Sequence, residues 1–154
     1  MSDLIAEQFF EDFIEGSVET FGHTEVTREE VIAFASRYDP QPFHLSDEAA
    51  AQTFFGRMSA SGWHTAAMTM AMMVAHQQAQ GHRGSGSPGV DELRFLRPVY
   101  PGDVLSVRRT ILNKRRSASR PGLGLFRSRI ETLNQKGEVV LSFEGTAFVE
   151  VRQP

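Results

Sequence analysis

The segment from Gly62 to Gln80 restricts the possible folds of this chain most strongly, because apolar side chains occupy nearly every side of a helix built from it. A helix with that distribution is expected to be buried all round. Threonines interrupt the apolar run, which is also too short for the roughly 20 apolar residues that span a bilayer. We therefore predict a core helix rather than a membrane helix. Its apolar residues are Trp63, Ala66, Ala67, Met68, Met70, Ala71, Met72, Met73, Val74 and Ala75.

The region after this helix supplies strands that could cover it. Residues 139–151 alternate between apolar and polar side chains, as a half-buried strand does. Turn sequences at residues 101–103, 120–122 and 134–137 divide the region into successive strands. Short connections of this kind favour antiparallel pairing. The predicted fold class is therefore α+β, with a curled antiparallel sheet wrapped around one long buried helix.

The N-terminal half is predicted to contain one strand and two short helices. Residues 17–26 form the first strand. Thr27 and Glu30 have the spacing of a capping box, which begins a helix that continues to Tyr38. Ser46 precedes acidic residues and alanines, a pattern typical of the start of a second helix.

The composition is that of an ordinary globular protein. We predict that residues 1–154 form a single domain. The 16 basic and 19 acidic residues give a net charge of −3, so neither nucleic acid nor a membrane is an expected partner. The chain has no cysteine, and methionines in a core helix are a common filler of irregular space, so we expect no metal site. The N-terminus has no basic region followed by an apolar run, which predicts a cytoplasmic location.

The stretch Asp39-Pro40-Gln41-Pro42-Phe43-His44 is the strongest candidate for a site. A residue before proline is pushed out of the helical region, so the preceding helix should end at Tyr38, and Pro42 should prevent an immediate restart. A rigid loop then presents a carboxylate and an imidazole, which together can hold a water molecule and exchange a proton with it. The same residues also fit an ordinary helix-ending turn and a histidine without a catalytic role, which is the commoner situation.

Four segments, at residues 39–44, 55–56, 60–65 and 95–103, together resemble the MaoC-like acyl dehydratases, the hot-dog-fold hydratases related to (R)-specific enoyl-CoA hydratase. The resemblance covers almost the whole chain. Asp39, Pro42 and His44 match the aspartate, proline and histidine of the family motif D-x-N-P-x-H. Gln41 stands where the hydratases usually carry asparagine, and Ser61 stands where many relatives have histidine.

This resemblance implies a hydro-lyase, an enoyl-CoA hydratase or 3-hydroxyacyl-CoA dehydratase of fatty acid metabolism. Asp39 and His44 would activate water as a unit, and the backbone N–H of Gly62 would stabilise the enolate oxygen. No cofactor is implied, because coenzyme A is part of the substrate. Ser59 and Ser61 are expected to cap the core helix, and His64 is expected to be structural or to line the pocket.

The partners that the resemblance implies are an acyl-CoA thioester and a second copy of the chain, in a homodimer or a larger homo-oligomer. Arg83, Arg94, Arg97 and residues 114–116 are the candidate cations for the phosphates of CoA. Two other functions stay open. A hot-dog thioesterase would need a site aimed at the carbonyl carbon, and a non-catalytic acyl-CoA-binding relative would explain the departures at Gln41 and Ser61.

Overall fold

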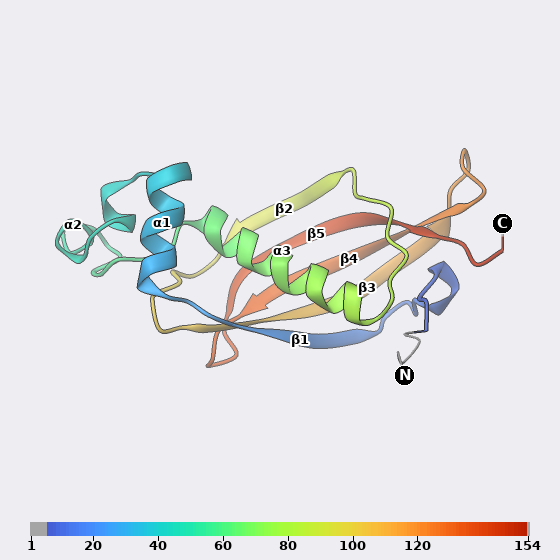
Figure 1. Cartoon of the computed structure of the whole chain (residues 1–154), viewed down its shortest axis with the longest axis horizontal. Coiled ribbons are helices and arrows are strands. Elements are labelled where there is room, and N and C mark those ends of the chain that lie inside the picture. Colours follow the sequence, from blue (N-terminus) through green and yellow to red (C-terminus); the bar gives the residue numbers. More distant parts are fainter. Residues whose placement is uncertain (1–5, 154) are drawn as a thin grey trace, which may run out of the picture.

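The computed structural model of the protein describes residues 6–153. In Figure 1 the strands form one twisted layer, α3 lies along one face of that layer, and α1 and α2 gather at one end of the molecule. The turn between β3 and β4 lies at the opposite end. The elements are η1 (Phe10–Asp12), β1 (Val18–Glu25), α1 (Arg28–Tyr38), η2 (Pro42–His44), α2 (Asp47–Ala50), α3 (Gly62–Ala79), β2 (Gly89–Phe95), β3 (Val104–Arg116), β4 (Leu123–Leu133) and β5 (Val139–Glu150).

The sheet has five strands in the order β1-β3-β4-β5-β2, and every neighbouring pair is antiparallel. All three predicted turns separate strands, since β3 begins after residue 103, β4 after residue 122 and β5 after residue 137. An antiparallel sheet that curls over a helix confirms the predicted α+β hot-dog architecture. The order leaves β1 and β2 as the two edges of the sheet.

The core lies between α3 and the sheet. Met68 and Met72 of α3 pack among buried aliphatic residues of the strands, which include Leu105, Ile130 and Leu141. A buried pair of threonines adds one polar link: Thr69 of α3 donates its hydroxyl hydrogen to the Thr65 carbonyl, and its Oγ1 lies 2.7 Å from Thr132 Oγ1 on β4. A hydroxyl group has a single hydrogen, so Thr132 must be the donor to Thr69. This bond fixes the position of α3 along β4.

The burial of α3 corrects one expectation. The sequence predicted a helix buried on all sides, but Trp63, Met70 and Val74 are 58%, 48% and 40% exposed. The sheet of one chain covers only one face of the helix, so the flank toward β2 stays open. None of the helices in residues 6–153 combines the length and the apolar character that crossing a bilayer requires.

The predicted elements before α3 are all present. Thr27 caps α1 by accepting a hydrogen bond from the Glu30 N–H at 3.3 Å, and Ser46 caps α2. One detail differs, because Pro42 begins the single turn of η2 instead of delaying a new helix. Proline is well suited to the first position of a helical turn, where its missing N–H would have no partner in any case.

Candidate active site

Asp39 is placed by the end of α1. Its backbone N–H donates to the Ala35 carbonyl at 2.9 Å and closes the last turn, and Pro40 prevents the helix from continuing. The predicted end of this helix at Tyr38 is confirmed. The carboxylate, 24% exposed, then points into the loop region where η2 and the start of α3 meet it.

His44 is the last residue of η2 and is only 6% exposed. Its Nδ1 lies 2.7 Å from the carbonyl oxygen of Ser59. A carbonyl oxygen can only accept a hydrogen bond, so Nδ1 must carry a proton. In the neutral ring, Nε2 is therefore the nitrogen with a free lone pair, and it is the atom that can take up a proton.

The two side chains meet at Asp39 Oδ2, which lies 3.5 Å from His44 Nε2. This separation is longer than an ordinary N–H···O hydrogen bond. When the carboxylate is ionised and the ring is neutral, both atoms are acceptors, and one water molecule that donates a hydrogen to each would satisfy them. The geometry can therefore hold a water and receive its proton.

Ser61 binds the same carboxylate oxygen. Its hydroxyl donates to Asp39 Oδ2 at 2.7 Å and accepts from the Trp63 N–H at 3.2 Å. The second bond is the predicted helix cap of α3. The first bond was not predicted, because the capping pattern of a serine says nothing about a partner 22 residues away. Ser61 thus connects the start of α3 directly to Asp39.

Gly62 is the first residue of α3 and faces the same space. Its N–H donates to no acceptor among residues 6–153, as is usual in the first turn of a helix. The helix dipole favours negative charge at this end. A Cβ at this position would lie 2.6 Å from a ring carbon of Phe95, so only glycine allows this close packing of the ring on the backbone.

These residues surround a cavity of about 330 Å³. Polar groups occupy one part of its wall, while aromatic and aliphatic side chains form most of the remainder, a composition common in pockets for small organic ligands. Asp39, His44 and Gly62 are therefore brought together in one wall, as the sequence suggested. The other lining residues are Phe54, Phe55, Ala60, Trp63, Thr65, Phe95, Leu96, Arg97, Pro98 and Val99.

His64 and Ser59 take supporting positions. The His64 ring is buried and stacks on Phe34 with 4.8 Å between ring centroids, and its burial lowers its pKa. It does not line the cavity, so the structural alternative of the prediction holds. The expectation that Ser59 caps α3 is wrong, because Ser61 is the residue next to the helix and caps it, while the Ser59 side chain is fully buried and its Oγ has no hydrogen-bond partner among residues 6–153. The backbone carbonyl of Ser59, through the bond to His44, is the part that shapes the site.

The candidate cations for CoA fall into two groups, according to whether they line the cavity. Arg97 lines the cavity and forms an ion pair with Glu138 at 3.0 Å. Arg83 and Arg94 are engaged in ion pairs with nearby glutamates, and Lys114 and Arg116 lie beside η1. Within residues 6–153, no three or more histidine, aspartate or glutamate side chains are grouped to hold a metal ion.

Comparison with known proteins places the chain in a family. The family model described as "MaoC like domain" matches residues 9–123. The chain is similar to a solved MaoC-like dehydratase from Rhodospirillum rubrum, with 40% identity, a TM-score of 0.84, and coverage of 96% of this chain and 99% of that one. It is 28% identical to the uncharacterized protein YdeM of Bacillus subtilis over 93% of this chain and 98% of YdeM.

A third relative carries an enzyme name. The 3-hydroxybutyryl-CoA dehydratase of Methylorubrum extorquens is 32% identical over 65% of this chain and 61% of that protein. The family model covers well over half of the chain and includes every residue of the cavity wall. The fold, the cavity and the match together show that the chain belongs to the MaoC-like family.

Proposed function

We propose that this protein is a hydro-lyase that adds water across the double bond of a 2-enoyl thioester, or removes water from a 3-hydroxyacyl thioester. The observation that carries the proposal is the placement of Asp39 Oδ2 and His44 Nε2, 3.5 Å apart in the wall of a largely apolar cavity. Relatives named as a CoA dehydratase and a CoA hydratase support the same reaction class.

In the hydration direction, the water held between Asp39 and His44 attacks the β-carbon of the substrate. His44 Nε2 takes a proton from this water as the C–O bond forms, since its Nδ1 is already committed to Ser59. The pair then returns a proton to the α-carbon, so that water has been added with no net change in the protein. Dehydration runs through the same steps in reverse.

Negative charge develops on the thioester oxygen during this reaction. The free N–H of Gly62, at the positive end of an 18-residue helix, is the group suited to receive it. The Phe95 ring packs directly against the backbone of Gly62 at this point. An interaction made mainly in the transition state raises the rate constant of the chemical step.

The thioester carrier would be coenzyme A, with Arg97 as the first candidate for a phosphate contact. Arg97 is the candidate cation that lies in the cavity wall, and its side chain is 58% exposed. Its partner Glu138 would compete with a phosphate for the guanidinium. Binding of CoA should therefore be weakened by salt and by loss of Arg97.

The test is hydration of trans-2-enoyl-CoAs, beginning with crotonyl-CoA and extending to longer chains. Loss of the enoyl-thioester absorbance is followed while free thiol is measured in parallel. We expect turnover without thiol release in the wild type, and at least a hundredfold lower kcat in Asp39→Asn and His44→Ala. His23→Ala, which removes an exposed histidine on β1, is the matched control and should retain full activity.

Each other outcome points to a different function. Thiol release would identify a thioesterase, and binding of acyl-CoA without turnover would identify a non-catalytic relative. Near-normal turnover in both Asp39→Asn and His44→Ala would refute the proposed pair.

We also propose that the protein forms a homodimer through the flank of α3 and strand β2. This flank exposes Trp63, Met70, Val74, Val90 and Phe95 beside a sheet edge with no partner strand among the described residues. Exposed apolar patches next to a free edge are usually covered in solution. Light scattering should give twice the chain mass of 17.2 kDa, and Val90→Lys should shift the population toward monomer. A monomeric wild type at micromolar concentration would contradict this assembly.

A further inference from the structure

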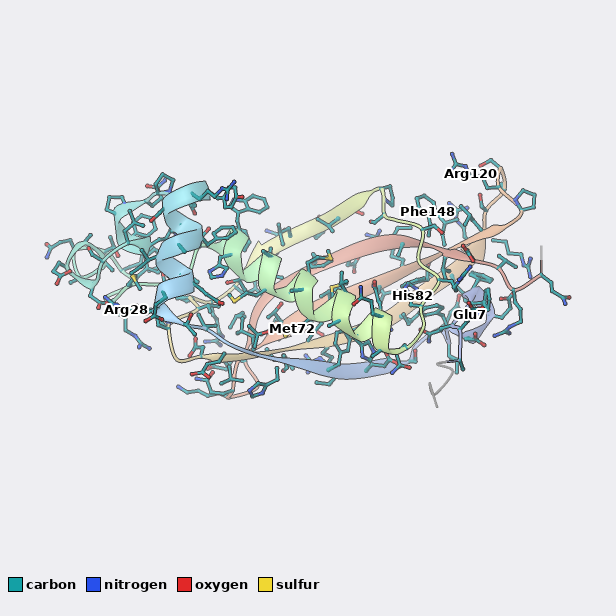
Figure 2. All side chains as sticks on the ribbon, viewed as in Figure 1. Glu7, Arg28, Met72, His82, Arg120 and Phe148 are labelled. Carbon is teal, nitrogen blue, oxygen red and sulfur yellow. The ribbon has the colours of Figure 1, made fainter. Side chains whose placement is uncertain are left out.

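A second cavity, of about 390 Å³, lies beneath the C-terminal half of α3. It is separate from the first cavity, and the two share no lining residue. Figure 2 shows His82 at the C-terminal end of α3, where the chain leaves the helix and runs toward β2. This connection is held in place, because His82 N–H donates to the Gln77 carbonyl and Ser85 N–H donates to the Phe148 carbonyl, both at 2.9 Å.

Most of the wall of this second cavity is apolar, with Met70, Val74, Ile130 and Phe143 among its residues. Its polar lining residues are Gln77, Gln78, His82, Ser87, Arg109, Ser128 and Thr146. Arg109 of β3 is the charged one among them, and it is only 4% exposed. Arg109 lies on the same face of β3 as the buried residues Val107 and Ile111. The alternating pattern of the strand predicts an apolar core residue at this position, but the residue is a cation.

Arg109 is only partly satisfied. Its Nη2 donates to Glu19 Oε2 at 2.7 Å, while its Nε is buried and has no hydrogen-bond partner among residues 6–153. Glu19 is 42% exposed and also contacts His76, so it is shared between two partners. Burying a polar N–H without a partner costs about 1–3 kcal/mol, which makes such a group unusual in an otherwise well-packed core.

His82 has the same property. Its Nε2 is buried without a partner in the described part of the chain, and its ring packs edge-on against Phe13 and Phe126. Burial, reinforced by the charge of Arg109, lowers the pKa of His82 to about 4, so the ring is neutral at pH 7. Two buried nitrogens without hydrogen-bond partners among the described residues thus belong to residues that line one cavity.

We propose that this cavity binds a carboxylate carried on an apolar chain, with Arg109 and His82 receiving the carboxylate and the aliphatic wall enclosing the chain. The volume is within the range of about 300–1,000 Å³ that is common for small-ligand sites. The carboxylate would accept hydrogen bonds from Arg109 Nε and from His82 Nε2, with the neutral ring in the tautomer that carries its proton on Nε2. The chain would cover Met70, Val74 and Phe143.

The charge balance favours a carboxylate over a phosphate. Glu19 already offsets the charge of Arg109, and neutral His82 adds none. A buried group with two negative charges would remain largely uncompensated, whereas one carboxylate needs only a share of the guanidinium and one further donor. A neutral alcohol of the same chain length offers one uncharged acceptor oxygen in place of the two charged oxygens of a carboxylate, so it would form weaker hydrogen bonds.

Such a carboxylate could come from two sources. One is the distal end of the acyl group of the substrate, and this reading rests on the proposed function. Trp63, Met70 and Val74 form one stripe on α3 from the first cavity to the second; it is exposed in the single chain and would lie along the proposed dimer interface. The helical rise places Met70 about 12 Å and Gln77 about 22 Å from Gly62. The other source is a free carboxylic acid that binds independently of catalysis.

The test measures binding of octanoate by isothermal titration calorimetry, with 1-octanol as the neutral probe of equal length. We expect octanoate to bind more tightly than octanol. Arg109→Met and His82→Phe should each weaken octanoate binding by about tenfold or more and weaken octanol binding much less. Glu19→Gln should strengthen octanoate binding, because the competing carboxylate is removed. This variant keeps Arg109 in place, so it tests the proposal even if Arg109→Met does not fold.

The proposal is overturned if octanoate binds no more tightly than octanol, or if none of the three variants changes the affinity for octanoate. Either result is expected if ordered water molecules bind the two nitrogens instead of a ligand. Kinetics then identify the source. If the acyl group reaches the cavity, Arg109→Met lowers kcat/KM for trans-2-octenedioyl-CoA, which ends in a carboxylate, at least tenfold more than for trans-2-octenoyl-CoA. If a free acid is the ligand, the two substrates respond equally while octanoate binding is still lost. The calorimetric result stands even if the protein hydrates no enoyl-CoA.

Discussion

Replacement of Ser61 by alanine tests how the two halves of the candidate site are joined. Ser61 donates to Asp39 Oδ2 at 2.7 Å and caps α3 through the Trp63 N–H. A hydrogen bond to an ionised group contributes about 1.5–3 kcal/mol. If this bond holds Asp39 in its reactive position, its loss should lower kcat by about 10–100-fold. KM should change little, because the bond is made to the enzyme and not to the substrate.

The same substitution also removes a helix cap, which costs about 1 kcal/mol of stability, so two further variants separate the effects. Ser61→Gly keeps most of the capping stability but has no hydroxyl, and it should show the same loss of kcat. Thr27→Ala removes the corresponding cap of α1, and it should lose stability while keeping kcat. Rates are measured with the enoyl-CoA that the wild type hydrates fastest, and stability by urea unfolding. A Ser61→Gly variant with kcat within twofold of wild type would refute the positioning role.

Two other variants probe the surroundings of the sites. Gly62→Ala would place a Cβ 2.6 Å from the Phe95 ring, so we expect a loss of about 1–3 kcal/mol in urea unfolding together with a lower kcat, and the double variant with Phe95→Ala should regain stability. His82 has a pKa of about 4 in the folded chain and an ordinary pKa of 6.5 in the unfolded chain. Between these two pH values the unfolded chain therefore binds a proton that the folded chain does not bind. Stability should therefore fall as the pH drops from about 6.5 toward 4, with about 2 kcal/mol lost between pH 7 and pH 5 that His82→Phe does not lose. Burial also lowers the pKa of His64, so His64 contributes to the pH dependence of the wild type. The quantity to compare is therefore the difference in unfolding free energy between the wild type and His82→Phe at each pH.

Features encoded within a few residues could be predicted from the sequence. The caps at Thr27, Ser46 and Ser61, the end of α1 before Pro40 and the turns between strands depend on local backbone chemistry, and the structure has them where they were expected. Ser59, which was also expected to cap α3, does not. The proximity of Asp39 and His44 follows from the same kind of signal, a short loop braced by prolines. Their catalytic role stays a prediction, since it came from a resemblance to a family.

Features that depend on distant segments could not be predicted. Three features depend on elements that are far apart in the chain. They are the hydrogen bond from Ser61 to Asp39, the contact of Phe95 with Gly62, and the burial of Arg109. Hydrophobic periodicity identifies Arg109 only as a charged residue on the core-facing side of a strand. It does not identify the residue with which Arg109 pairs. The one-sided burial of α3 was missed for a related reason, because an apolar surface is needed equally for a core and for contact with another chain.

The strand order also has a consequence for how the chain is made. β2 is synthesised before β3, β4 and β5, yet its only neighbour among the described residues is β5, the last strand. A nascent chain must therefore carry an unpaired β2 until β5 leaves the ribosome. Contacts between segments so far apart slow folding and prolong the exposure of apolar surface. Strand β2, which ends at Phe95 beside Gly62, thus depends on β5 for its pairing, and a chain truncated before β5 should accumulate as aggregate rather than as a partly active protein.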